Sequence, residues 1–94
     1  MVVIRNCFVA KPGMAGKLAA QLKEAAAAGK LTNVRVMTDL VGDFNTVVME
    51  HEAQNIGEFE AKLKEYMSSA EMREKMKGYT DLWTTGSREV FQVV

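Results

Sequence analysis

Residues 33–52, NVRVMTDLVGDFNTVVMEHE, decide the fold because they have the pattern of a β-hairpin. An apolar, β-branched run ending near Leu40 and a second run starting at Val47 flank residues 41–44, which hold a Gly-Asp pair. Short Gly/Asp connections between such runs are typical of antiparallel hairpins. Val47 and Val48 are neighbours, and a strand sends neighbouring side chains to opposite faces. Both faces of the hairpin are therefore apolar, and each needs a cover.

The chain before the hairpin predicts one strand and one helix. Residues 2–10, VVIRNCFVA, alternate so that Asn6 shares a face with the even-numbered apolar residues and Arg5 shares the other with the odd-numbered ones. Residues 14–28 follow a Pro-Gly pair and carry small and apolar residues at helical spacing. We expect this helix to end at a left-handed Gly29.

The chain after the hairpin predicts a helix in two pieces. Asn55 and Glu58 form the pattern of a capping box, in which the Asn side chain accepts from a free N–H group and the Glu reaches back. Ser68 and Glu71 repeat that pattern, so we expect the helix to break and restart there. Gly78 is expected to end the second piece.

The complete element order predicts a ferredoxin-like α+β fold. Residues 80–86 are expected to form a connector and residues 87–94 the last strand, which gives the order βαββαβ in one domain over residues 1–94. Two helices cover one face of such a four-stranded antiparallel sheet. Because the second face is also apolar, we expect two sheets to pair face to face as a homodimer. The alternative is that the connector and long side chains cover the second face.

Composition excludes several classes of partner. Twelve Lys and Arg balance twelve Asp and Glu, so the chain lacks the basic surface that nucleic acids select. No apolar run reaches the roughly 18 residues that a membrane helix needs. Cys7 is the single cysteine, which favours a reducing, cytoplasmic location. No Cys/His spacing predicts a metal site and no glycine-rich loop predicts a phosphate site, so we expect no metal and no cofactor.

Two short motifs resemble known families. Residues 9–13, VAKPG, which lead into an Ala/Leu-rich helix, resemble the strand-to-helix passage of antibiotic biosynthesis monooxygenase-like proteins. Residues 42–48, GDFNTVV, are similar to the third-strand entry of NIPSNAP-like proteins. Both families belong to the dimeric α+β barrel superfamily. The resemblance implies a face-to-face homodimer with a small pocket between sheet and helices, and some such barrels oxidise quinol-like aromatics without a cofactor.

Five residues are predicted to line a ligand pocket: Asn6, His51, Tyr66, Met76 and Trp83. An amide in mid-strand is unfavourable unless it is hydrogen-bonded, so Asn6 is either a ligand contact, a satisfied core amide or a dimer contact. His51 is the only histidine, and it is either a base or a pocket-lining residue without a catalytic role. The Met and Tyr residues are core filler or an adaptable pocket wall, and Trp83 is a lid over the core or a ligand platform.

The resemblance also bears on haem. Asn6 matches the first-strand Asn of the haem-degrading branch of the monooxygenase-like proteins. His51 stands where those relatives carry a tryptophan, and Met76 stands where they supply an axial histidine. The departure at Met76 argues against haem breakdown as the activity of this chain.

Two functions remain as hypotheses. The first is a NIPSNAP-like barrel protein whose dimer binds a small apolar ligand. The alternative is a cofactor-independent monooxygenase that acts on a quinol-like aromatic substrate. No residue is assigned a catalytic role, because no partner for His51 can be found from spacing.

Overall fold

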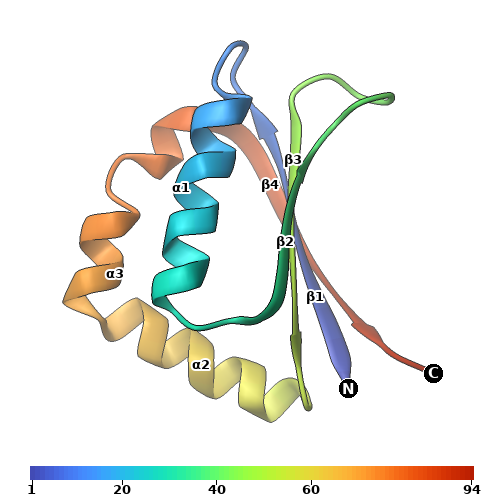
Figure 1. Ribbon diagram of the computed structural model, residues 1–94, viewed down its shortest axis with the longest axis vertical. Coiled ribbons are helices and arrows are strands. Elements are labelled where there is room, and N and C mark those ends of the chain that lie inside the picture. The colour runs from blue at the N-terminus through green and yellow to red at the C-terminus, as the bar shows by residue number, and fades with distance from the viewer.

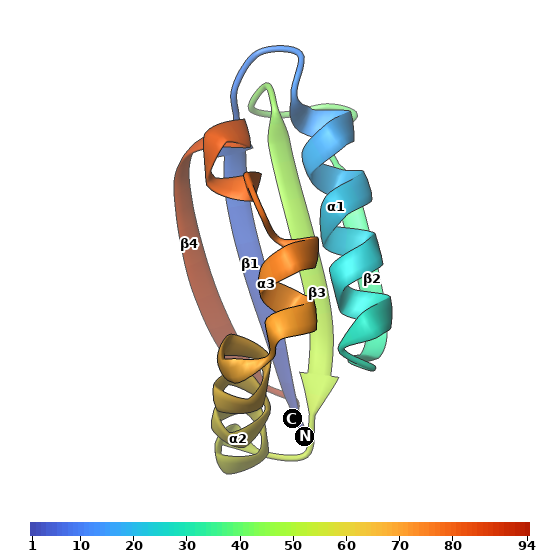
Figure 2. The same ribbon diagram turned by 90° about the vertical axis from the view of Figure 1, so that its left-hand side faces the viewer.

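The computed structural model describes residues 1–94 and shows one antiparallel sheet with all helices on the same side (Figure 1). The strands lie in the order β2-β3-β1-β4, which with helices on one face is the predicted ferredoxin-like α+β fold. In Figure 2 the helices lie in front of the sheet, and β4 is the strand that they leave uncovered. The elements are β1 (Val2–Ala10), α1 (Ala15–Ala28), β2 (Thr32–Thr38), β3 (Thr46–Ala53), α2 (Ile56–Ser68), α3 (Ala70–Lys75), the 3-10 helix η1 (Tyr79–Leu82) and β4 (Trp83–Gln92).

Strand β1 has the predicted division of its side chains between two faces. Val2, Ile4 and Asn6 are buried beneath the helices, whereas Arg5 and Cys7 lie on the other face and are only half-buried. The same division runs through β3, which pairs with β1 in antiparallel register, so that Asn6 lies opposite Met49 and Ile4 opposite His51. This register places Asn6 and His51 at diagonal positions of neighbouring strands, both on the helix-covered face.

The main core forms where α1 packs on the sheet. Leu18 and Leu22 of α1 are buried against Val47 and Met49 of β3, and Leu82 of η1 joins them. Each fully buried side chain of this size stabilises the fold by about 1.5–3 kcal/mol. Helix α1 therefore fixes the side of the sheet on which any internal cavity must lie.

The left-handed residue that follows helix α1 lies one position later than predicted. Gly29 keeps a right-handed conformation, with φ −78°, and the left-handed residue is Lys30, with φ +54°. The glycine serves a different purpose, because a Cβ atom at Gly29 would lie 3.2 Å from the ring of Tyr66. Gly29 thus allows α1 and α2 to approach closely at this point.

The break between α2 and α3 is confirmed, but its cap is shifted by one residue. Asn55 Oδ1 accepts from the Glu58 N–H at 2.9 Å, as predicted. The Oγ atom of Ser69 accepts from the Met72 N–H at 3.3 Å, so Ser69 caps α3. Ser68 instead donates its hydroxyl to the Lys64 carbonyl oxygen at 2.9 Å inside α2. Either serine hydroxyl can cap a helix, so tertiary packing decides which of the two residues becomes the N-cap of α3.

The predicted connector over residues 80–86 is largely structured. Its first part lies in η1, and β4 begins at Trp83 and extends to Gln92. Gly86 lies opposite Phe8, where a Cβ atom would lie 3.2 Å from the Phe8 ring. The glycine that suggested a loop is therefore a strand residue that makes room for an aromatic ring. Leu82 packs in the core under the helices, so this segment does not cover the second face of the sheet.

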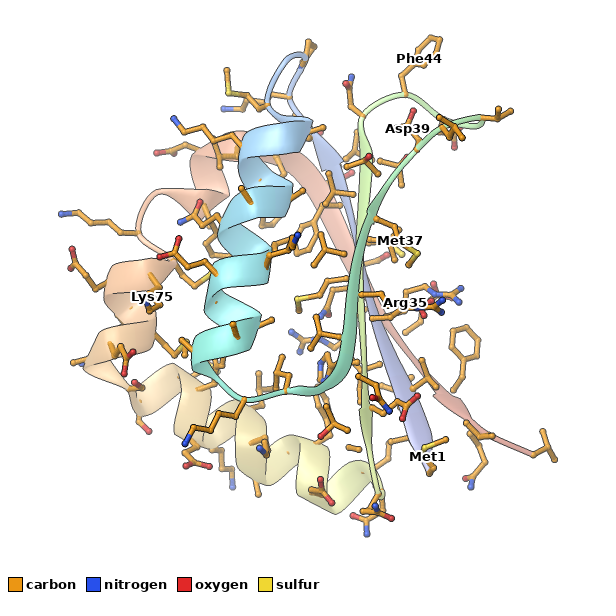
Figure 3. All side chains as sticks on the ribbon, in the orientation of Figure 1. Met1, Arg35, Met37, Asp39, Phe44 and Lys75 are labelled. Atoms are coloured by element: carbon orange, nitrogen blue, oxygen red, sulfur yellow. The ribbon has the colours of Figure 1, made fainter.

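The hairpin is confirmed, with a longer connection than predicted. The loop covers residues 39–45, and Asp39 Oδ1 accepts from the Thr46 N–H at 2.9 Å to close it. Leu40, expected near the end of a strand, is 96% exposed, and Phe44 is 84% exposed. In Figure 3 Arg35 and Met37 point away from the helices, toward the face of the sheet that has no cover.

A network of charges occupies the middle of this open face. Glu50 Oε2 accepts from Arg5 Nε at 2.8 Å and Glu50 Oε1 accepts from Arg35 Nη2 at 2.9 Å. These bonds from Arg35 and then Arg5 hold the pKa of Glu50 below its ordinary value of 4.5. Ion pairs thus join three neighbouring strands, and only 10% of the Glu50 side chain is exposed.

Replacing Glu50 by Gln is expected to reduce the free energy of unfolding at neutral pH by about 1 kcal/mol, a value kept small because both arginines remain well solvated. A lowered folded-state pKa stabilises the fold above pH 4.5 and ceases to do so as pH falls through the folded pKa. The wild-type protein should therefore lose more stability below pH 4.5 than E50Q does. Urea unfolding from pH 3 to 7 measures this, with E60Q at an exposed position as the control; parallel profiles for E50Q and wild type would contradict it.

Candidate functional site

An apolar cavity lies between the sheet and the helices α1 and α2. Its volume is about 120 Å³. Strands β1, β3 and β4 form one wall, while α1, α2 and the segment after α3 form the other. The lining side chains are mostly hydrophobic or aromatic, with few polar ones: Asn6, Phe8, Leu22, Leu31, Met49, His51, Phe59, Lys62, Leu63, Tyr66, Met76, Tyr79 and Arg88.

Asn6 and Arg88 form the first polar contact of the cavity wall. They lie opposite each other in the β1–β4 register, and Arg88 Nε donates to Asn6 Oδ1 at 2.7 Å. This bond orients the amide, and Asn6 Nδ2, which is not among the fully buried unpaired atoms, makes no side-chain hydrogen bond within the protein. The Arg88 guanidinium also lies over the Phe59 ring, 5.5 Å from its centroid. Asn6 is 7% exposed, so its amide is directed into an apolar surrounding.

His51 is the second buried polar residue of the cavity. It is 5% exposed, and its Nδ1 atom is buried without a hydrogen-bond partner. Burial, followed by the charges of Arg88 and Lys62, lowers the pKa of His51 below its ordinary value of 6.5. The ring is therefore neutral at pH 7. An unpaired buried nitrogen is unfavourable, and a ligand group that bonds to it would remove that cost.

Tyr66 and Met76 lie on the helix side of the cavity. Burial raises the pKa of the Tyr66 hydroxyl above its ordinary value of 10.0, and neighbouring Tyr79 raises it further. Met76 follows α3 and packs against the main core. Together with Asn6 and His51, they line the same cavity. Four of the five residues named from the sequence thus come together.

Trp83 does not line the cavity. Its ring packs edge-on against Phe8, with the centroids 5.3 Å apart, and lies 6.0 Å from the ring of Tyr79. Phe8 and Tyr79 are both lining residues, so Trp83 forms a second layer behind them. The indole Nε1 is buried without a partner.

Lys62 and Arg88 are cavity residues that were not among the five named from the sequence. Lys62 had a detectable signal, since it lies within the apolar stripe Phe59, Leu63 and Tyr66 on one side of α2. Arg88 had none, because its place opposite Asn6 depends on the pairing of β1 with β4. No group of three or more His, Cys, Asp or Glu residues is placed to hold a metal ion. No helix is long and apolar enough to cross a membrane.

The fold and the cavity together define a class, that of ferredoxin-like α+β proteins with an internal pocket between sheet and helices. An uncharacterized NIPSNAP domain protein from Burkholderia xenovorans has this fold, with a TM-score of 0.86, 10% identity and coverage of 100% of this chain and 95% of its own. A NIPSNAP family protein from Agrobacterium tumefaciens matches with a TM-score of 0.86 and 9% identity, over 99% of this chain and 92% of its own. A candidate antibiotic biosynthesis monooxygenase from Chloroflexus aurantiacus matches with a TM-score of 0.77 and 17% identity, over 99% of this chain and 92% of its own.

These likenesses confirm the predicted resemblance at the level of the fold. At such low identity they show the fold alone. Neither a protein-family model nor a curated protein matches the sequence. What the cavity does must therefore be argued from its own residues.

The titration of His51 provides a test of the cavity geometry. Because its folded-state pKa is lowered, the unfolded chain binds the proton more readily, and stability should fall as pH drops below 6.5. The slope cannot exceed about 1.4 kcal/mol per pH unit for one proton. NMR titration of the imidazole should give a midpoint below 6.5, and H51Q should remove this part of the stability profile. A midpoint above 6.5 would contradict the buried, cation-flanked position.

Proposed function

We propose that the protein binds a small, largely apolar ligand in the cavity between sheet and helices. The observation that carries the proposal is an apolar cavity lined by His51, a buried residue whose Nδ1 atom has no hydrogen-bond partner. Asn6 Nδ2 adds a free donor from the neighbouring strand. Pockets with an apolar wall and a few converging polar groups are the usual form of small-molecule sites.

The size of the cavity limits the ligand to about one ring. An apolar cavity of roughly 150 Å³ accepts benzene. The volume here is about 120 Å³, so a single six-membered ring or a short branched chain fits with small side-chain adjustments. Met49 and Met76 line the wall and have the flexible side chains that allow such adjustment.

An NMR titration with single-ring compounds such as phenol tests this proposal. We expect shifts of the backbone amide signals of Asn6, His51 and Tyr66, with saturation at high ligand concentration. Leu63→Phe should fill the cavity and weaken binding at least tenfold. Met67→Phe is the matched control, because Met67 lies on the same helix and is 69% exposed. Shifts that do not saturate, or equal binding by both variants, would overturn the proposal.

A second candidate is cofactor-independent oxidation of a quinol-like aromatic. The neutral His51 supports it, because an imidazole nitrogen without a partner can accept the proton of a bound phenol. Molecular oxygen would then add to a ring carbon of the deprotonated quinol. The O–O bond breaks, one oxygen atom stays on that carbon in place of its hydrogen, and the other leaves as water, so that the quinol becomes a hydroxyquinone. Oxygen consumption with a panel of quinols tests this, and it should depend on His51 but not on exposed Lys64. Equal rates for H51Q and wild type would exclude it.

We also infer that the open face of the sheet pairs with the same face of a second copy. Three apolar side chains support this, since Val9 is 42%, Met37 36% and Phe91 44% exposed on a face that no helix covers. A sheet with an exposed apolar face commonly buries that face against the same face of a second copy. Sedimentation at micromolar concentration should find twice the chain mass of 10.4 kDa. A folded species of 10.4 kDa would contradict the inference.

The location that we propose is the cytoplasm. Support comes from Cys7, which is a free thiol on the open face, 3.9 Å from a Glu89 carboxylate oxygen. Burial raises the pKa of this thiol, and nearby Glu89 raises it further, so the thiol stays protonated at neutral pH. Fractionation of cells that express a tagged chain tests the location, and recovery in an oxidising compartment would contradict it.

A further inference from the structure

The charge of the cavity is one-sided. Among the side chains that line it, the charged ones are Lys62 and Arg88, and no carboxylate is present. Neither cation takes part in an ion pair, whereas Arg5, Arg35 and Lys75 elsewhere in the molecule do. The cavity wall therefore holds two positive charges without ion pairs, on half-buried Lys62 and on Arg88, whose side chain also reaches solvent.

Two acidic residues close to Lys62 make hydrogen bonds to other groups. Glu52 and Glu58 line a smaller hollow beside Lys62. Glu52 Oε1 accepts from Asn33 Nδ2 at 2.8 Å, on the far side of β3. Glu58 Oε2 accepts from the Gln54 N–H at 3.3 Å at the start of α2. These bonds hold the two carboxylates away from the cavity, so its positive charges have no internal counter-ion.

Several hydrogen-bond donors lie in the cavity wall, on Asn6, Lys62 and Arg88. Asn6 Nδ2 is free, and Arg88 uses Nε for Asn6 but keeps its two terminal nitrogens. Lys62 and Arg88 both lie close enough to His51 to lower its pKa. Other lining side chains, such as Leu22, Leu63 and Met76, offer only hydrocarbon and sulfur.

We propose that the ligand is a small carboxylic acid, bound as its carboxylate, with the charged group at Asn6, Lys62 and Arg88 and the hydrocarbon part among the apolar side chains. This inference rests on the proposed binding function and names the class of ligand. A guanidinium edge matches the planar geometry of a carboxylate, and charge-assisted bonds are about twice as strong as neutral ones. A phosphate fits less well, because one arginine and one lysine must then offset a second charge beside an apolar wall.

Three planar compounds of nearly equal shape and different charge test the inference: benzoate, benzamide and benzamidine. Their dissociation constants are measured by NMR titration at pH 7.5 and low salt. We expect benzoate to bind about tenfold more tightly than benzamide, and benzamidine to bind more weakly than either. Equal or reversed affinities overturn the carboxylate inference but leave the proposed binding function standing. Failure of all three compounds to bind overturns both.

Variants of the two cations show whether they carry the preference. K62M and R88M should each weaken benzoate binding severalfold more than they weaken benzamide binding, which a purely structural role would not produce. K64M is the matched control, because Lys64 lies on the same helix, is exposed and does not line the cavity. Because Arg88 also bonds to Asn6, K62M provides the test should R88M fail to fold. Unchanged benzoate binding in K62M together with a folded, unchanged R88M would overturn the inference.

Discussion

Replacing Leu18 by alanine is expected to lower the free energy of unfolding by about 3 kcal/mol, within the usual 2–5 kcal/mol for a fully buried leucine. Leu18 is completely buried, and it packs in the core that joins α1 to β3. Truncation removes its contacts and leaves a void that the sheet behind it cannot fill. Domains of this size are stable by about 5–15 kcal/mol, so this single change removes a large share. Urea unfolding followed by circular dichroism measures it.

The hairpin loop supplies a matched control for Leu18. Leu40 is 96% exposed, so the same substitution at Leu40 should change the free energy of unfolding by less than about 0.5 kcal/mol. Both variants remove the same three carbon atoms, and only their burial differs. Equal effects at the two positions would contradict the packing of α1 on the sheet.

A charge on the open sheet face is expected to separate the proposed dimer. Val9 lies on this face near the end of β1 and is 42% exposed, so an aspartate there is tolerated in one copy. In a face-to-face pair, each copy would bury an unpaired carboxylate, which is strongly unfavourable. We expect the dissociation constant of Val9→Asp to rise at least 100-fold. Sedimentation velocity at micromolar concentration should then find the 10.4 kDa chain.

The helix layer provides the control for this experiment. Met67→Asp introduces the same charge at a position that is 69% exposed on α2, away from the open face. It should leave the oligomeric state unchanged. A Val9→Asp protein that still sediments at twice the chain mass would exclude pairing through this face.

The fold could be predicted because the order of its elements is clear and because neighbouring residues of a strand alternate between its two faces. In β1 this alternation separates Ile4 from Arg5 without ambiguity, and the observed burial follows it. The ends of the elements were less predictable. Ser68 and Ser69 are equivalent caps from the sequence, and Gly86 resembles a loop residue until Phe8 is placed opposite it. Both choices depend on contacts between distant parts of the chain.

The candidate site was predictable from polarity within apolar strands. Asn6 and His51 are polar residues at buried positions, and each lies in the cavity wall. Arg88 could not be assigned in this way, because charged residues on an edge strand are normally surface residues and its partner is 82 positions away. Trp83 was predicted to line the cavity, but its ring packs behind the lining residue Phe8. Sequence spacing does not distinguish a ring in a cavity wall from a ring behind it.

The pairing of β1 with β4 affects the nascent chain during synthesis on the ribosome. Val2 pairs with Gln92 and Ala10 with Trp83, so one side of β1 has no partner until the chain has been synthesised beyond residue 83. Until then, its N–H and C=O groups form an open edge. Such long-range closure is slow compared with helix formation. Ribosome-bound chains that stop before β4 therefore carry a template through which neighbouring nascent chains can aggregate.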